Sequence, residues 1–378
     1  MTLREDSAPF RTFVLKIANR CNIDCDYCYV FNSKDQAWSS LPARMSLDVV
    51  REAARRIAEH VTSHGLPSVH VVLHGGEPLL AGPRHLADLL GAIRSGVPES
   101  TDVHFELQTN GTLLTDAWLD LFERYDVAVG ISLDGPPAVN DRHRLTHASR
   151  STAASAVRGI ELLRTRPHLF AGILAVVDLA NDPVEVHDYL AGFHPPTIDF
   201  GFPHGTHDSP PHRNDPGVPE YGQWMSRVYE AWLAQPEYRH SVRMLEDIVA
   251  LTSGVCGSVE TIGLAPPASV VIESDGSIEA VDTLRSVGEG ASWLGLDVFS
   301  QPFDQVMRHP KLLHREYGID ALAEKCQTCP LVDVCGGGYL PHRFSSAHGY
   351  RNPSVYCADL EHLIRHVQGS LRQHGWDP

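Results

Sequence analysis

Long apolar runs are missing from this chain of 378 residues. It contains no stretch of about 18 apolar residues that would cross a membrane. Its N-terminus has no apolar core of the kind found in secretory signals. We therefore expect a cytoplasmic protein with no membrane partner.

Basic residues are also scarce, because 31 Lys and Arg face 47 Asp and Glu, which gives a formal net charge of −16. A nucleic-acid surface needs clustered cations that neutralise phosphates, so no nucleic-acid partner is expected. The hydrophobic fraction of 43% is ordinary for a globular protein, and the length is sufficient for two domains.

The eight cysteines are expected to bind metal, because cytoplasmic thiols are kept reduced and rarely form disulfides. Cys21, Cys25 and Cys28 share one short loop. Three thiolates satisfy three irons of a four-iron cluster and leave the fourth iron open to another ligand. The alternatives are a chance cluster and a zinc knuckle, although the knuckle needs a fourth protein ligand.

Strand and helix patterns alternate along the N-terminal half. Strands are predicted over 13–17, 69–73, 103–108, 127–133, 169–177 and 197–202, and helices over 46–60, 83–95, 115–124, 151–165 and 183–191. Six such alternations predict a parallel sheet with right-handed crossovers. In β/α barrels the chemistry takes place at the C-terminal ends of the strands, which is where the cysteine loop stands. Residues 1–10 are expected to be a short disordered lead.

Four further cysteines follow near the C-terminus: Cys326, Cys329, Cys335 and Cys357. Four thiolates are a full set for a closed four-iron cluster or for a structural zinc, and the spacing alone does not choose between them. Between the two cysteine sets, residues 202–219 are rich in proline and histidine. We interpret them as a mobile linker rather than a metal or substrate site. Two helices are predicted after it, over 220–234 and 241–252.

The C-x3-C-x2-C loop is followed, after the second predicted strand, by Gly75, Gly76, Glu77 and Pro78. Together these motifs resemble the radical S-adenosylmethionine (SAM) superfamily. The resemblance implies an α/β fold with a partial (β/α)6 barrel and a [4Fe-4S] cluster whose open iron chelates SAM. It also implies that Glu77 and the glycine-loop backbone hold the SAM amino group, and that the Tyr27 ring packs near the adenine.

Three other side chains are candidate SAM contacts. Asn110 and Ser132 end predicted strands, where a short polar side chain reaches a ribose or a carboxylate. The stretch from Asn140 to Arg144 resembles the H-D-x-x-R run of the family, which would let Arg144 pair with the SAM carboxylate. A solvated loop charge is an equal alternative for Arg144.

The C-terminal cysteines resemble the SPASM extension of radical SAM peptide maturases. In that family Cys326, Cys329, Cys335 and Cys357 would bind an auxiliary [4Fe-4S] cluster. Val281 and Tyr339 stand where the family has cysteines of a further auxiliary cluster, and Cys256 alone remains of that set. We therefore predict one auxiliary cluster and two clusters in total, with Cys256 either a plain buried thiol or a residue near the substrate.

Asp282 directly follows Val281, which stands where the family has a cysteine ligand. Related maturases keep an aspartate there that faces the substrate, so Asp282 is a candidate catalytic base. A solvated turn carboxylate is an equal alternative.

The segments VCGSVETIGLAPP (255–267) and CGGGYLPHR (335–343) resemble the FxsB-type branch, which acts on ribosomally synthesised peptides (RiPPs). The resemblance implies an oxidoreductase whose 5′-deoxyadenosyl radical abstracts a side-chain hydrogen. Loss of a second electron and a proton would then give a crosslink, a cyclophane-like C–C bond or a related one. The implied partners are a precursor peptide and a reductant protein such as flavodoxin or ferredoxin.

The expected domains are the radical SAM partial barrel at 1–203, a linker with bridging helices at 204–252, and a SPASM-like domain with a C-terminal helix at 253–378. No leader-binding winged-helix domain is expected before the barrel. Two alternative functions remain open: a sulfatase-type maturase that forms formylglycine, and a non-catalytic metal-binding module.

Overall fold

The computed structural model describes residues 8–235, 237, 240–265, 268–312 and 318–376. Most of the expected disordered lead, residues 1–7, lies outside these ranges, as do the last two residues of the segment 255–267. Phe10, at the end of that lead, is buried with 3% of its surface exposed, so the expectation was wrong at this residue.

The chain forms two compact units. The first contains Met1–Ser132, His143–Ala171 and Pro267–Glu316, and the second contains Leu133–Arg142, Gly172–Pro266 and Tyr317–Pro378. The expected domain boundaries after residues 203 and 252 stay a prediction.

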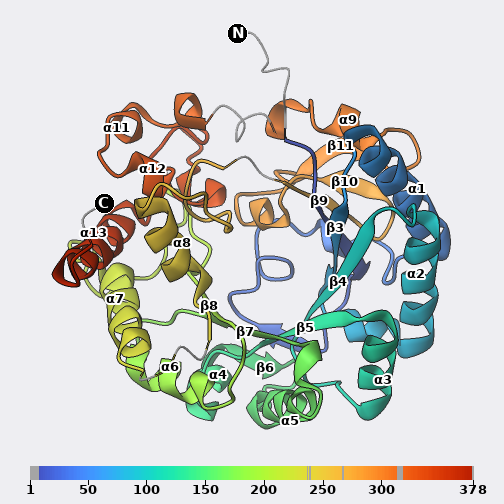
Figure 1. The fold of residues 1–378 in the computed structure, drawn as a ribbon, viewed down its shortest axis with the longest axis horizontal. Coiled ribbons are helices and arrows are strands. Elements are labelled where there is room, and N and C mark those ends of the chain that lie inside the picture. Colours follow the sequence, from blue (N-terminus) through green and yellow to red (C-terminus); the bar gives the residue numbers. More distant parts are fainter. Residues whose placement is uncertain (1–7, 236, 238–239, 266–267, 313–317, 377–378) are drawn as a thin grey trace. The chain divides into compact units, whose positions relative to one another are not determined.

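A largely parallel sheet forms the centre of the first unit, with the strand order β11-β10-β9-β1-β3-β4-β5 (Figure 1). Its parallel strands β1, β3, β4 and β5 span Thr12–Ala18, Ser68–Gly75, Asp102–Thr109 and Val127–Ser132. On the other side of β1, β9 (Ser269–Ile272) is also parallel to it, and β10 (Ser277–Glu279) and β11 (Trp293–Asp297) continue antiparallel. A segment more than 250 residues away in sequence therefore borders the first strand.

Helices follow the parallel strands of the first unit and lie along the outer side of the sheet (Figure 1). They are α1 (Leu47–His64), α2 (Pro83–Gly96), α3 (Asp116–Tyr125) and α5 (Ala153–Arg164). In α1 the hydroxyl of Ser46 accepts a hydrogen bond from the Val49 backbone and so caps the start of the helix. The apolar residues of α1 recur every three to four positions and are buried, which directs this face toward the sheet. A short helix, α9 (Phe303–Val306), follows β11.

The second unit contains the parallel pair β7 (Phe170–Val176, of which Phe170 and Ala171 belong to the first unit) and β8 (Ile198–Gly201). Its longer helices are α6 (Pro183–Ala191), α7 (Glu220–Leu233), α8 (Arg243–Thr252) and α13 (Cys357–Gln373). Its shorter ones are α4 (Pro137–His143, which ends in the first unit), α11 (Glu324–Gln327) and α12 (Val332–Cys335). The predicted α/β class and the alternation of strands with helices are confirmed.

Within the described ranges, no helix combines the length and the apolar character that crossing a membrane requires.

Candidate functional site

The first cysteine set lies directly after β1, in the first unit. The loop contains a short strand that the sequence did not reveal, β2 (Ile23–Cys25), which pairs antiparallel with β6 (Arg144–Thr146). Cys25 stands opposite Arg144 in this pairing, and the Cys28 backbone donates to the Cys25 carbonyl at 3.0 Å. The loop is therefore folded into a hairpin-like turn instead of being a free connection.

The three thiols of this loop influence one another electrostatically. Burial raises the pKa of Cys21 to about 12, and the nearby charges of Glu77, Cys25 and Cys28 add to the shift. Thiolates that lie near one another repel, and a bound cation relieves this repulsion. The set thus fits an iron–sulfur cluster held by three protein thiolates.

The glycine loop after β3 is pressed against the chain that leads into Cys21. The Gly76 backbone donates to the Ala18 carbonyl at 2.7 Å, and the Glu77 backbone donates to the Arg20 carbonyl at 2.9 Å. A Cβ on Gly75 would lie 2.1 Å from the Ala18 oxygen, and one on Gly76 would lie 2.4 Å from the Arg20 oxygen. Only glycine allows this close approach, so the loop fixes the start of the cysteine turn.

Glu77 is fully buried and has three hydrogen-bond donors. Its carboxylate accepts from the Leu79 backbone at 3.0 Å, the Thr109 hydroxyl at 2.7 Å and the Asn110 backbone at 2.8 Å. Burial raises its pKa, although these hydrogen bonds act in the opposite direction. The side chain therefore joins the glycine loop to the end of β4, and its expected contact with SAM stays a prediction.

The other expected SAM contacts of the first unit differ in their surroundings. Asn110 donates to the Asn22 side chain at 2.9 Å and lies 3.9 Å from the Cys21 sulfur, which places it at the cysteine loop. Arg144 is buried, and its guanidinium donates to the Tyr27 hydroxyl at 2.8 Å. The solvated-charge alternative for Arg144 is thus wrong. Ser132 accepts from Gln108 at 2.9 Å, at the end of β5.

Asp282 is buried in a group of polar side chains at the end of β1. It forms an ion pair with Lys16 and accepts a hydrogen bond from the Tyr29 hydroxyl at 2.8 Å. Lys16 also lies 3.0 Å from Nδ1 of His74. Burial alone would raise the pKa of Asp282, but the charge of Lys16 and the hydrogen bonds from Lys16 and Tyr29 outweigh it and lower the pKa. The solvated-turn alternative for Asp282 is therefore wrong.

His74 complements this ion pair as a neutral group. Burial and then the charge of Lys16 lower its pKa to about 4, so the imidazole is uncharged at neutral pH. Sequence reasoning missed both Lys16 and His74. The available signal was a lysine inside the otherwise apolar strand 13–17, where a cation is buried only with a partner.

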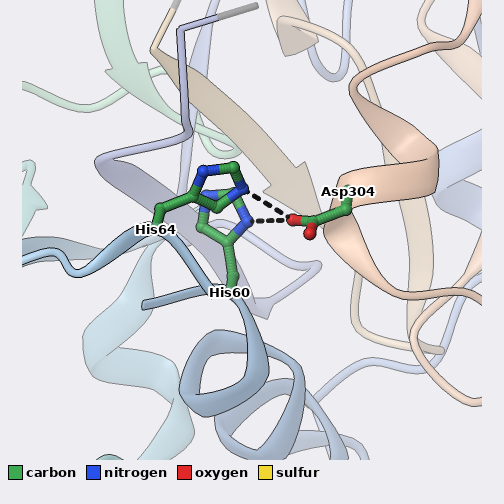
Figure 2. A group of neighbouring side chains, drawn as sticks. All are labelled: His60, His64 and Asp304. Atoms are coloured by element: carbon green, nitrogen blue, oxygen red, sulfur yellow. Dashed lines mark hydrogen bonds and ion pairs between the residues drawn. The ribbon is translucent and has the colours of Figure 1, made fainter. Parts of the chain in front are cut away.

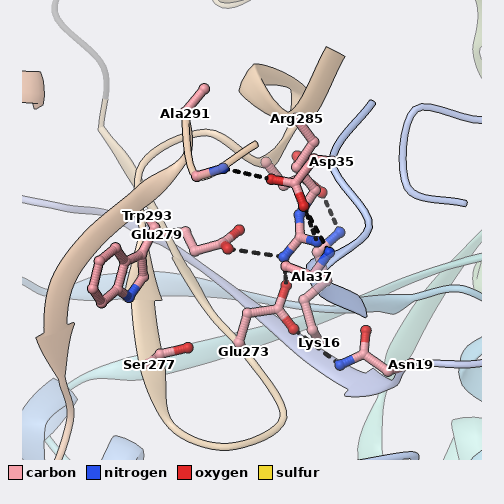
Figure 3. A network of polar contacts seen from close by, with 12 residues as sticks. Lys16, Asn19, Asp35, Ala37, Glu273, Ser277, Glu279, Arg285, Ala291 and Trp293 are labelled. Atoms are coloured by element: carbon pink, nitrogen blue, oxygen red, sulfur yellow. Dashed lines mark hydrogen bonds and ion pairs between the residues drawn. The ribbon is translucent and has the colours of Figure 1, made fainter. Parts of the chain in front are cut away.

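A second buried network connects the segment after β10 to the cysteine loop (Figure 3). Arg285, in the 3-10 helix Asp282–Ser286, donates to Glu273 at 2.9 Å and to Glu279 at 2.8 Å. Glu273 accepts from Asn19 at 3.1 Å, two residues before Cys21. Burial and the charge of Glu273 raise the pKa of Glu279 to about 7. The network thereby ties the Asp282 segment to the chain that carries the first cysteine.

The C-terminal cysteines belong to the second unit: Cys326 lies on α11, Cys335 on α12 and Cys357 at the start of α13, while Cys329 lies between α11 and α12. Burial raises the pKa of Cys335 to about 12, and the charges of Cys357, Cys326 and Cys329 add to the shift. The other three thiols of this set therefore lie near enough to Cys335 to influence its charge, and four thiolates are the full number for a [4Fe-4S] cluster. Cys256 is exposed, so the prediction that it is a buried thiol was wrong.

Tyr339 places an aromatic side chain where the family has a cysteine ligand. Tyr339 is buried, with its ring 5.4 Å from that of His342 and 6.2 Å from that of His204.

The proline- and histidine-rich stretch 202–219, which was expected to be a mobile linker, is held in place in the second unit. The His207 ring lies 2.8 Å from the Pro353 carbonyl, and Arg213 forms an ion pair with Asp359. The proline-rich stretch is thus packed against the cysteine-bearing segment.

Comparisons with known proteins agree with this geometry. Residues 15–176 match the family model described as the radical SAM superfamily. A serine-type anaerobic sulfatase-maturating enzyme of Klebsiella aerogenes is 28% identical over 96% of this chain and 88% of its own length. Among solved structures, native anSMEcpe with bound AdoMet superposes with a TM-score of 0.82 at 20% identity, covering 96% of this chain and 98% of that one.

A more distant structure is that of Streptococcus suis SuiB bound to the precursor peptide SuiA. It has a TM-score of 0.58 at 15% identity and covers 93% of this chain and 76% of that one. At these identities the structural matches show a common fold.

Proposed function

We propose that this chain, whose residues 15–176 match the radical SAM superfamily, matures a ribosomally synthesised peptide by forming a crosslink between side chains. Its role as a radical SAM maturase follows from the family match and the relatives. The peptide substrate and the FxsB-type branch are part of the proposal. Substrate peptides accompany two of the similar solved structures, anSMEcpe and SuiB, which supports a peptide here.

The cofactors are assigned to the two cysteine sets. Cys21, Cys25 and Cys28 would hold the [4Fe-4S] cluster that binds SAM, with Tyr27, Asn110 and Arg144 beside it. Cys326, Cys329, Cys335 and Cys357 would hold the auxiliary [4Fe-4S] cluster. When bound, the first cluster and SAM would supply a 5′-deoxyadenosyl radical able to take a hydrogen atom from the substrate. The auxiliary cluster would accept the second electron or brace the C-terminal fold.

Asp282 is proposed to accept the proton that leaves the substrate. A crosslink removes two hydrogens: one as an atom, and the other as a proton and an electron. The lowered pKa keeps Asp282 ionised at neutral pH but makes it a weaker base than a free aspartate, so it would accept a proton only from a substrate group made strongly acidic by the oxidation. Lys16 and Tyr29 bond to the carboxylate and orient it, and His74 contacts Lys16 in turn.

The way the cysteines divide into sets is the observation that favours a crosslink over formylglycine. All eight lie within the described residues and separate into a set of three, a set of four and the exposed Cys256. A single thiolate does not hold a four-iron cluster, so only two clusters can form. Formylglycine-forming maturases resemble this chain but normally use three clusters.

Formylglycine formation is the second candidate, and one observation favours it. The similarity to the serine-type sulfatase-maturating enzyme covers 96% of the chain, far beyond the region matched by the family model. A buried carboxylate such as Asp282 would also serve to deprotonate a serine hydroxyl during its oxidation.

Co-expression with a short peptide encoded next to the gene tests the proposal by mass spectrometry. We expect a product lighter by two hydrogen atoms that does not react with an aldehyde probe, and that fragments as a crosslinked ring. Asp282→Asn should lose this product but still cleave SAM, whereas Cys21→Ala should lose both. The same mass change with a positive aldehyde test would replace the proposal with formylglycine formation.

A further inference from the structure

Two histidines and an aspartate meet in the first unit, outside the cysteine loop (Figure 2). His60 and His64 lie one turn apart in α1 and so occupy the same side of the helix, while Asp304 comes from α9. Nδ1 of His60 lies 2.7 Å from Oδ1 of Asp304, and Nε2 of His64 lies 3.0 Å from the same oxygen. These three potential ligand atoms lie within 4.8 Å of one another.

The spacing is close to that of a metal coordination sphere. Zinc binds imidazole nitrogen and carboxylate oxygen at about 2.0–2.2 Å, so neighbouring ligand atoms in a tetrahedron are about 3.3 Å apart. The nitrogen–oxygen distances of 2.7 and 3.0 Å are only slightly shorter. At these two contacts, replacing the hydrogen-bonding protons with an ion requires each nitrogen and the oxygen to separate by only a few tenths of an ångström, and the two imidazole nitrogens lie within 4.8 Å of one another.

The site has one rigid side and one open side. The His60 side chain is fully buried, and its ring lies 5.8 Å from that of Phe10, 6.0 Å from that of Phe13 and 6.2 Å from that of Phe303. The side chains of His64 and Asp304 are 29% and 42% exposed. A buried, fixed nitrogen and two more accessible ligands leave room for water to complete the coordination.

The local electrostatics favour a cation here. The His60 side chain is fully buried, which favours the neutral imidazole that can donate a lone pair to a metal. His64 lies in the last turn of α1, where the helix dipole favours positive charge. Asp304 supplies the negative charge that a divalent ion needs.

We propose that His60, His64 and Asp304 form a binding site for a divalent transition-metal ion, separate from the iron–sulfur centres. Two imidazoles and one carboxylate with an open fourth position match the ligand preference of zinc. The bound ion would connect α1 to α9 and hold the segment after β11 against the outer helix of the sheet. The site goes beyond the proposed maturase function and does not depend on it.

Zinc binding to the reconstituted enzyme tests this site. The holoenzyme would be freed of loosely bound metal with a chelator and titrated with Zn²⁺, with zinc and iron per chain measured together. Asp304→Asn keeps the size of the side chain but removes the charge, and His64→Gln removes one ligand. We expect each variant to bind at least tenfold more weakly at one site while its iron content stays unchanged.

Two controls separate this site from others. His168→Gln removes an exposed histidine whose Nε2 lies 3.7 Å from Glu123, and this variant should bind zinc as the parent does. Zinc captured by stray cysteines would persist in Asp304→Asn and in His64→Gln alike. Equal zinc binding by the parent and both variants would overturn the proposal. If Asp304→Asn does not fold, His64→Gln decides the result on its own.

Discussion

At the residue scale, the ion pair between Lys16 and Asp282 is the feature with the largest consequences. Both groups are buried, and each is the main compensation for the other. Removing one member of a buried pair leaves an uncompensated charge, which usually costs more than the pair itself contributes. The pair therefore constrains which substitutions the site tolerates.

We predict that Lys16→Met lowers the stability of the folded protein by about 3–5 kcal/mol. The thermal unfolding midpoint of the apo and reconstituted proteins measures this loss. In the double variant Lys16→Met/Asp282→Asn no buried charge remains, so its loss should be smaller than the sum of the two single losses. Strictly additive losses would contradict a direct coupling between the two side chains.

Glu279 makes the stability of the folded protein fall as the pH rises, whereas a carboxyl group with a lowered pKa has the opposite effect. Its pKa is raised from 4.5 to about 7, so the folded protein binds a proton more tightly than the unfolded chain does. This stabilisation is complete below pH 4.5 and is lost as the pH rises through about 7. We expect Glu279→Gln to flatten the fall in unfolding midpoint between these values. Parallel profiles for the parent and the variant would show that Glu279 is not protonated in the fold.

At the scale of elements, the glycine loop after β3 and the turn after β1 behave as one unit. Two backbone hydrogen bonds join them, and both glycines lie too close to backbone oxygens to carry a side chain. The hairpin of β2 and β6 adds Arg144 to the same turn by pairing it with Cys25. A change in any one of these elements should therefore displace the thiols of the first cysteine set.

We predict that Gly76→Ala displaces the cysteine turn, since its Cβ would lie 2.4 Å from the Arg20 oxygen and 2.6 Å from the Phe31 ring. The expected result is a clear loss of iron at the first cysteine set and of SAM binding, measured by iron analysis and equilibrium dialysis. Gly91→Ala, in α2, is the matched control. Its new Cβ would have its nearest neighbour at 3.5 Å, so iron and SAM binding should remain at parental levels. Full iron loading of Gly76→Ala would refute the role of this contact.

At the scale of the whole molecule, the cysteine partition sets the iron content. Two four-iron clusters give about eight irons and eight sulfides per chain after anaerobic reconstitution. We predict that changing Cys21, Cys25 and Cys28 to Ala leaves about four irons, and that changing Cys326, Cys329 and Cys335 to Ala does the same. Cys256→Ala should keep about eight. About twelve irons in the parent would mean that residues other than cysteine complete a third cluster.

The order of the elements was predictable because it depends on local patterns. Helix α6, for instance, begins at Pro183 and ends at Ala191, as its sequence predicts, because Asp182 caps it and proline occupies its first turn. Strand β9 was not predictable as the neighbour of β1. Its four residues carry no local mark of their partner, which is chosen by packing across more than 250 residues of chain.

The two cysteine sets, the glycine loop and the α/β class can be read from the amino-acid sequence, since spacing and periodicity are properties of the chain alone. That Arg144 and Asp282 are buried and paired, and that Lys16 and His74 join Asp282, follows from the folded arrangement. It also brought His60 and His64 to Asp304. Whether a charged side chain is a solvated surface group or part of a site depends on burial and on partners distant in sequence. Those are fixed only when the strands and helices pack.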